Sequence, residues 1–318
     1  MHNEKHNFKN LTLLFISVLT YSTVLILNKL ASKKIFFPND VGSISRRFPL
    51  DITPAPIIFP VIWSIIYFWQ TIWLIYAAIF HFRRCSNRYL LYRVVPLFHP
   101  VFFIGFIANN IGMIVWLFVW TNKLVGWSFV GLLFLTLSLY LALYVSYKSL
   151  YLSQDQLFIL NLKKDLWLVR ILVQNGLAFF ATWVTIASCL NLATYLTYDL
   201  LIELSISTTC SLSILSFICV LFSIFENFIW QKYLLYTFSP WLVLLTGLSG
   251  SLYKNYPKNE QNLSRNNILT MCLLMACACF FVVKIVMFSL YKTIWKERVD
   301  KKESHRLLQA KQDNQAPL

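Results

Sequence analysis

The chain is poor in charged residues and in glycine. Charged residues make up 13% of its 318 residues, whereas a soluble domain usually has about 25%. Only 8 residues are glycine, while 58% of the chain is hydrophobic. Acidic residues are scarce as well: the chain has 13 Asp and Glu but 28 Lys and Arg, which gives a formal net charge of +15. These numbers exclude an ordinary soluble domain and predict an integral membrane protein.

Several kinds of catalytic and cofactor motif are absent from the sequence. There is no glycine-rich phosphate loop, no Gly-x-Ser-x-Gly elbow, no paired-histidine or carboxylate-rich metal motif, and no repeat of 20 to 50 residues. Six of the seven cysteines lie inside apolar runs, which predicts small buried side chains rather than disulfides or zinc ligands: Cys189, Cys210, Cys219, Cys272, Cys277 and Cys279. The sequence therefore predicts a protein that is not an enzyme and holds no metal or cofactor.

Long apolar runs are the main feature of the sequence. A bilayer core about 30 Å thick is crossed by a helix of about 20 apolar residues. Open strands are excluded in lipid because their backbone groups would lack partners. The sequence thus predicts an all-α membrane protein with about eight transmembrane helices, at residues 11–28, 57–82, 94–120, 124–150, 167–195, 208–229, 233–252 and 267–291.

The basic residues lie in the connectors and the tail, beside these runs. This placement favours anionic lipid headgroups as partners and disfavours nucleic acid. With eight spans, the side that holds both termini receives 17 Lys and Arg and the other side receives 9. Basic connectors are retained in the cytoplasm, so both termini are predicted to be cytoplasmic. The Asn262 glycosylation tripeptide then lies outside, and its occupancy is left open.

Two helices carry the residues of a known family pattern. Pro54 stands just before the second predicted span, and Phe59, Ile62, Trp63, Ile66 and Tyr67 follow inside that span. The fifth span contains Trp183, Ala187, Leu190 and Asn191, and the spacings between these residues are those of the family's fifth helix. This arrangement resembles the TspO/MBR family of translocator proteins, or tryptophan-rich sensory proteins. Segments 37–55 and 226–256 are also similar to an animal group of multi-pass membrane proteins related to that family.

The third span gives a looser match, and other positions depart from the pattern. Asn109 and Asn110 precede Trp116 and Trp120, where the family has Asn and Trp on its third helix at a different spacing. Ala55 stands where the family has a second proline, and Phe179 and Phe180 replace its Pro-Tyr before the fifth-helix tryptophan. The family also has five helices rather than eight.

The resemblance implies a domain organisation and a binding site. It implies a five-helix bundle over residues 1–200 with a lipophilic pocket, so that the three remaining helices over 201–291 are an addition. The tail over 292–318 is basic, polar and poor in apolar residues, which predicts a mostly disordered cytoplasmic segment. It implies binding, and transport or sensing, of a lipophilic or planar aromatic molecule such as a tetrapyrrole. The ligand-binding residues that follow are Pro54, Trp63, Tyr67, Asn110, Trp116, Trp183 and Asn191. A non-catalytic membrane scaffold or assembly subunit is the alternative, and homo-oligomerisation stays open.

Charged residues inside the spans form a second candidate cluster. A charge at the centre of a span costs about 2.5–3.5 kcal/mol on insertion scales, so it usually faces protein or water. Glu226 in the sixth span, Lys284 in the eighth and Arg170 in the fifth are all expected in the inner third of the bilayer. Glu226 is predicted to form an ion pair with Lys284, with Arg170 as the alternative partner. Separately, Leu141, Tyr144 and Lys148 fit a weak sterol-contact pattern.

Overall fold

The protein is a bundle of helices, seen in a computed structural model that describes residues 7–85, 89–257 and 263–313, with side chains through residue 293. The described residues form no strand. The helices in chain order are α1 (Phe8–Ser32), α2 (Val41–Arg47), α3 (Ile58–Phe82), α4 (Leu91–Val94), α5 (Pro100–Thr121), α6 (Val125–Ile159), α7 (Lys163–Leu168), η1 (Val169–Asn175), α8 (Gly176–Tyr198), α9 (Leu204–Ile224), η2 (Phe225–Ile229), α10 (Gln231–Leu234), α11 (Ser239–Asn255) and α12 (Arg265–Asp313). The segments η1 and η2 are π-helical and continue into their neighbours.

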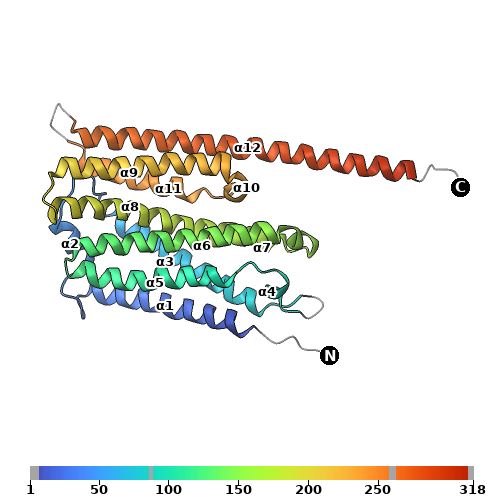
Figure 1. Cartoon of the computed structure of the whole chain (residues 1–318), viewed down its shortest axis with the longest axis horizontal. Helices are drawn as coiled ribbons and strands as arrows, with labels where there is room; N and C mark the ends of the chain where they lie inside the picture. The colour runs from blue at the N-terminus through green and yellow to red at the C-terminus, as the bar shows by residue number, and fades with distance from the viewer. Residues whose placement is uncertain (1–6, 86–88, 258–262, 314–318) are drawn as a thin grey trace.

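Among the described residues, seven helices rather than eight are long and apolar enough to cross a membrane. The difference lies in the predicted span at 233–252, which forms the single turn α10 and the helix α11. Pro240 stands in the first turn of α11, where a missing backbone N–H costs nothing, so the helix restarts there. At 17 residues, α11 is about 26 Å long and still runs back across the bundle, antiparallel to α12 (Figure 1).

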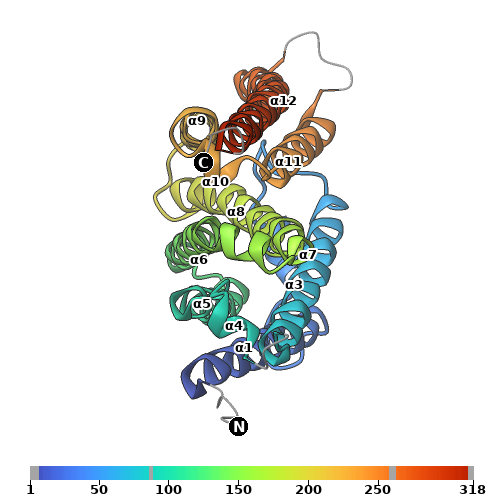
Figure 2. The ribbon, with the colours of Figure 1, turned by 90° about the vertical axis from the view of Figure 1, so that its right-hand side faces the viewer.

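The helices pack in a sequence that centres on α8. Helix α5 packs between α1 and α6, and α6 packs between α5 and α8, while α3 contacts both α1 and α8 (Figure 2). Helices α9, α11 and α12 form a second group, which joins the rest mainly through α8. The most apolar stretch of the α7 to α8 helix is 78% buried, against 17% for that of α12. Helix α8 is therefore the shared core of both groups, and α12 lies at the periphery.

The two ends of the bundle match the sequence-based arrangement of the connectors. Helix α1 begins and α12 ends at one end, where α4, α7 and α10 also lie (Figure 1). The tail over residues 292–318 is predicted from the sequence to be mostly disordered. In the structure, α12 continues as a helix to Asp313. Asn262 lies outside the described residues.

Candidate functional site

The tryptophans of the family pattern meet at the interface of α3 and α8. Trp183 is 1% exposed and packs edge-on against Phe59, with ring centroids 5.5 Å apart. Trp63 is half-buried, stacks on Tyr67 at 5.5 Å and meets the edge of Phe180 at 6.0 Å. The rings thus contact one another directly, in the offset and edge-on geometries that aromatic pairs prefer. In the structure these residues therefore form packing contacts across the interface.

The asparagines of the pattern bond to neighbouring helices. Asn110 on α5 donates from Nδ2 to Oγ1 of Thr20 on α1, at 3.1 Å. Oδ1 of Asn191 on α8 accepts a hydrogen bond of 2.7 Å from the hydroxyl of Ser128 on α6. Both amides are buried, and buried amides in hydrocarbon usually link helices in this way. Trp116 lies elsewhere, stacked on Trp120 at 6.1 Å.

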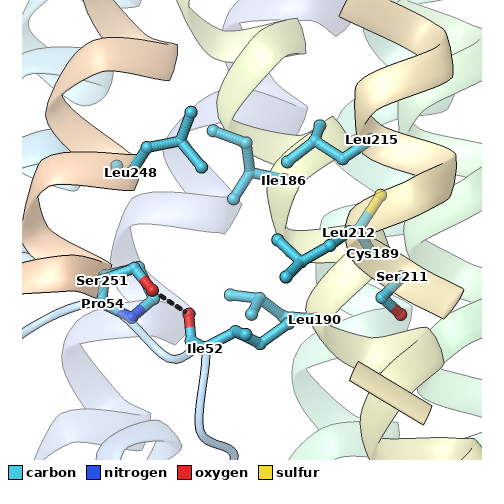
Figure 3. Close-up of a pocket in the computed structure, with 11 residues that line it drawn as sticks. Ile52, Pro54, Ile186, Cys189, Leu190, Ser211, Leu212, Leu215, Leu248 and Ser251 are labelled. Atoms are coloured by element: carbon cyan, nitrogen blue, oxygen red, sulfur yellow. Dashed lines mark hydrogen bonds between the residues drawn. The ribbon is translucent and has the colours of Figure 1, made fainter. Parts of the chain in front are cut away.

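Pro54 lines a small cavity between the α1 to α3 connector, α8, α9 and α11 (Figure 3). The volume is about 20 Å³, which is room for about one water molecule. The Ser251 hydroxyl on α11 closes one side by donating to the Ile52 carbonyl oxygen at 2.8 Å, the dashed line in Figure 3. The other six predicted ligand-binding residues line neither this cavity nor the larger one below. The structure therefore does not bring the seven residues together, and their role in binding stays a prediction.

A much larger cavity lies where the two groups of helices meet. Its volume is about 540 Å³, within the range of about 300–1,000 Å³ that small-molecule sites occupy. Nineteen residues from α6, α8, α9, η2, α10, α11 and the short segments beside α10 line it. Six of them are aromatic: Tyr140, Tyr144, Tyr147, Phe222, Phe225 and Trp230. This cavity is built in part by α9 to α11, which lie outside the first five helices in which the family resemblance implies a ligand pocket.

The larger cavity is open between α6 and α9. Helices α6 and α9 both pack on α8. The sides of α6 and α9 that face each other therefore border a space whose floor is α8. Tyr140 and Tyr144 on the α6 side are 43% and 44% exposed, and Leu221 and Phe225 on the other side are 37% and 40% exposed. Small side chains of α8, Ala178 and Ala181, form part of the floor. Because these are membrane-spanning helices, the opening faces the surrounding bilayer.

The family model for TSPO-like proteins matches residues 14–234, which is more than two thirds of the chain. The chain belongs to the TSPO-like protein family. This membership accounts for the all-helical, multi-span membrane architecture. The chain matches no curated protein and no solved structure.

The match covers more than the expected five-helix unit. It extends past residue 200, where that unit was predicted to end, through α9 and η2 to the last residue of α10. Most of the lining of the larger cavity lies inside the matched range, and only Thr237, Pro240 and Leu244 fall after it. In this TSPO-like protein, α11 therefore completes a cavity that the matched segment largely builds.

A buried charge pair lies behind the wall of the larger cavity. Lys284 on α12 is 3.1 Å from Glu226 on η2, measured from Nζ to Oε2, and both side chains are at most 2% exposed. Lys284 also donates to the Leu234 carbonyl oxygen at 2.9 Å, and the Trp241 indole N–H donates to Oε1 of Glu226 at 2.6 Å. The group connects α12, η2, α10 and α11. Arg170, the alternative partner of Glu226, instead lies 3.7 Å from the centre of the Tyr236 ring.

Sequence reasoning missed a second buried acid. Asp165 on α7 is 2% exposed and accepts from Nη1 of Arg83 at 2.6 Å and from the Tyr76 hydroxyl at 3.1 Å. In the sequence, Arg83 and Asp165 both lie in short polar connectors, where charges usually face headgroups, so no sequence pattern pairs them. Their contact fixes the end of α3 to α7.

Proposed function

We propose that this TSPO-like protein binds a lipophilic small molecule, and transports or senses it, in the 540 Å³ cavity between α6, α8 and α9 to α11. The supporting observation is the cavity itself. It is large enough for a small-molecule ligand, it is lined almost wholly by apolar and aromatic side chains, and it opens toward the bilayer. A molecule that partitions into lipid reaches such a site without passing through water.

The Trp and Tyr residues at the α3 to α8 interface have a supporting role in this proposal. They pack ring against ring and so stiffen α8, which carries part of the cavity floor. The planar aromatic ligand class that the family resemblance implies remains one of the candidates, and its binding is tested in the same experiment.

The test is equilibrium binding to the full chain in phosphatidylcholine nanodiscs. A solvatochromic hydrophobic dye and a porphyrin are each titrated, and the saturable emission change of the dye and the quenching of tryptophan by the porphyrin are recorded. Ile218 lines the cavity from α9, so Ile218→Trp should fill part of the space and weaken binding about tenfold or more. Ile214, one turn away on the same helix, is 39% exposed and does not line the cavity, so Ile214→Trp is the matched control.

The two variants decide the outcome. The proposal holds if Ile218→Trp alone weakens saturable binding. It fails if neither probe binds saturably, or if Ile218→Trp and Ile214→Trp bind as the unmodified protein does. Binding that is lost only in variants of Trp63 and Trp183 would return the site to the five-helix bundle.

A further inference from the structure

The charge of the cavity wall restricts the kind of molecule that it can hold. None of its nineteen lining residues is charged. Glu226, which follows the lining residue Phe225 in the chain, and its partner Lys284 are already bonded to each other, to Trp241 and to a backbone carbonyl group. A charged ligand would therefore enter without a counter-charge, and isolated charges are strongly disfavoured in such surroundings.

The hydroxyl groups in the wall differ in whether their hydrogens are free. The Thr182 hydroxyl donates to the Ala178 carbonyl oxygen at 2.8 Å. The Thr185 hydroxyl donates to the Ala181 carbonyl oxygen at 2.8 Å, so Tyr140, 2.7 Å away, must be the donor in the Tyr140 to Thr185 bond. All three hydrogens are thus used within the protein.

The pair of Tyr147 and Thr237 is different. Their hydroxyl oxygens are 2.8 Å apart, and this is the one hydrogen bond that either hydroxyl makes within the described residues. One of the two hydrogens makes the bond, so the other remains available. Both residues line the cavity and are buried, at 5% and 1% exposure. The pair therefore offers an unused donor at a fixed and buried place in the wall. The Tyr144 hydroxyl and the Trp230 indole N–H, which also line the cavity, make no hydrogen bond within the described residues either, but these two side chains are less buried.

The position of this donor matches the way that lipids lie in a bilayer. Thr237 lies beside α10, at the end of the bundle where α1 begins and α12 ends (Figure 1). Trp230 lies there too, with its ring 5.6 Å from Tyr144 and 5.9 Å from Phe225, and tryptophan favours the membrane interface. Leu215 and Leu244 line parts of the cavity farther along α9 and α11. An occupant could place its oxygen near the interface and its hydrocarbon part toward the middle of the bilayer.

We infer that the cavity binds an uncharged membrane lipid that carries a hydroxyl or ester oxygen, that the lipid enters sideways between α6 and α9, and that its oxygen accepts a hydrogen bond from the Tyr147 and Thr237 pair. This inference rests on the proposed function and names its ligand class and the residues that recognise it. Tyr144 of the sterol-contact pattern lines the opening, with Lys148 Nζ 6.0 Å from the centre of its ring.

The experiment compares three photoactivatable probes of equal chain length in nanodiscs that contain the full chain. One probe is a fatty alcohol, one is the corresponding hydrocarbon without oxygen, and one is the alkyl sulfonate. Labelled peptides are identified by mass spectrometry, and unlabelled sterol and diacylglycerol compete in separate arms. We expect saturable labelling by the alcohol on α6 and α9 near Tyr144 and Leu221, weaker labelling by the hydrocarbon, and none at this site by the sulfonate. The two competitors identify which lipid supplies the oxygen.

Two double variants isolate the hydrogen bond. A single substitution would leave one of the two hydroxyl groups as a donor, so Tyr147→Phe is combined with Thr237→Val. In this double variant the affinity for the alcohol should fall about tenfold, to the affinity for the hydrocarbon. The matched control, Tyr140→Phe with Thr185→Val, removes an equivalent pair that has no free hydrogen, and the alcohol should bind as before.

Each other outcome has a definite meaning. Equal losses in the two double variants, sulfonate labelling as strong as that of the alcohol, or labelling of α12 instead of α6 and α9 would overturn the inference while leaving a lipophilic site in place. The absence of saturable labelling by all three probes would overturn the proposed function as well.

Discussion

Lys284 and Glu226 form an ion pair inside the membrane-spanning part of the bundle, with 3.1 Å between Nζ and Oε2. They are 58 positions apart in the chain and lie on α12 and η2. Each has a further partner, because Glu226 accepts from Trp241 and Lys284 donates to the Leu234 carbonyl oxygen. The pair therefore holds the peripheral helix α12 against the wall of the larger cavity.

Breaking this pair should destabilise the protein strongly. Lys284→Met leaves the Glu226 carboxylate buried without a counter-charge, and removing one partner of a buried pair costs about 3–5 kcal/mol. Adding Glu226→Gln removes the charge and keeps an acceptor for Trp241, so the double variant should recover much of the loss. The measurement is the midpoint of thermal unfolding in detergent, taken for both single variants and for the double variant.

The control for this cycle is Lys164→Met. Lys164 is exposed on α7, so its replacement should change stability by no more than about 0.5 kcal/mol. If the losses from Lys284→Met and Glu226→Gln are simply additive in the double variant, the pair contributes no coupling energy and the expectation is wrong.

Gly250 should be intolerant of a side chain. A Cβ atom at this position would lie 2.6 Å from Cγ1 of Ile58 and 3.6 Å from Cβ of Pro54, and the Gly250 carbonyl oxygen accepts from the Ala55 backbone N–H at 3.0 Å. Gly250→Ala should therefore lower stability by about 1–3 kcal/mol through overpacking, despite the better helix propensity of alanine.

Gly131→Ala is the matched comparison for Gly250→Ala. At Gly131 the nearest atom to an added Cβ is 3.7 Å away, an ordinary contact with Trp116. The helix propensity of alanine should then dominate and raise stability by up to about 1 kcal/mol. A Gly250→Ala protein that unfolds at the same temperature as Gly131→Ala would show that α11 does not pack tightly on the proline segment.

Asp165 should contribute more to stability than its short connector suggests. Asp165→Ala removes the acceptor for Arg83 and Tyr76, and hydrogen bonds to charged groups contribute about 1.5–3 kcal/mol. Because the Arg83 side chain is 39% exposed, water can replace part of its hydrogen bonding to Asp165. The expected loss of stability in Asp165→Ala therefore lies near the low end of this range. Tyr76→Phe removes one bond only and should cost less, about 1 kcal/mol. Unfolding midpoints of the two variants, with exposed Asp155→Ala as control, test this order.

The helices were predictable because membrane burial imposes a simple rule on sequence. Apolar runs of the required length must be helices, and their order fixes which ends lie together. The span predicted at 233–252 carries no charged residue, and its division into α10 and α11 depends on the local signal of Pro240. Lys284 and Glu226 could be paired from depth alone, since few charges occur in the spans. Their contact with Trp241 depends on how α11 packs, which no linear pattern encodes.

The larger cavity could not be predicted from the sequence. It arises because α6 and α9 both pack on α8, where Ala178 and Ala181 leave space. Its lining residues are common membrane residues and form no motif. The family residues Trp63 and Trp183 were expected to line a pocket, but Phe59 and Phe180 lie against them. Whether large side chains leave a hollow or fill it depends on their neighbours across the interface.

The orientation of the bundle in the membrane gives the last prediction. Lys123, in the turn between α5 and α6, lies at the opposite end of the bundle from Lys232 on α10 (Figure 1). The end that includes Lys232 and both termini carries more Lys and Arg in its connectors, and such connectors are retained in the cytoplasm.

In a chain without its seven cysteines, Lys232→Cys and Lys123→Cys are each labelled with a membrane-impermeant maleimide. Lys232→Cys should react as soon as the plasma membrane alone is opened. Lys123→Cys should react either in intact cells, if the protein lies in the plasma membrane, or only after detergent dissolves the internal membranes. The reverse pattern would place the termini outside the cytoplasm, and identical patterns for the two variants would contradict their location at opposite ends.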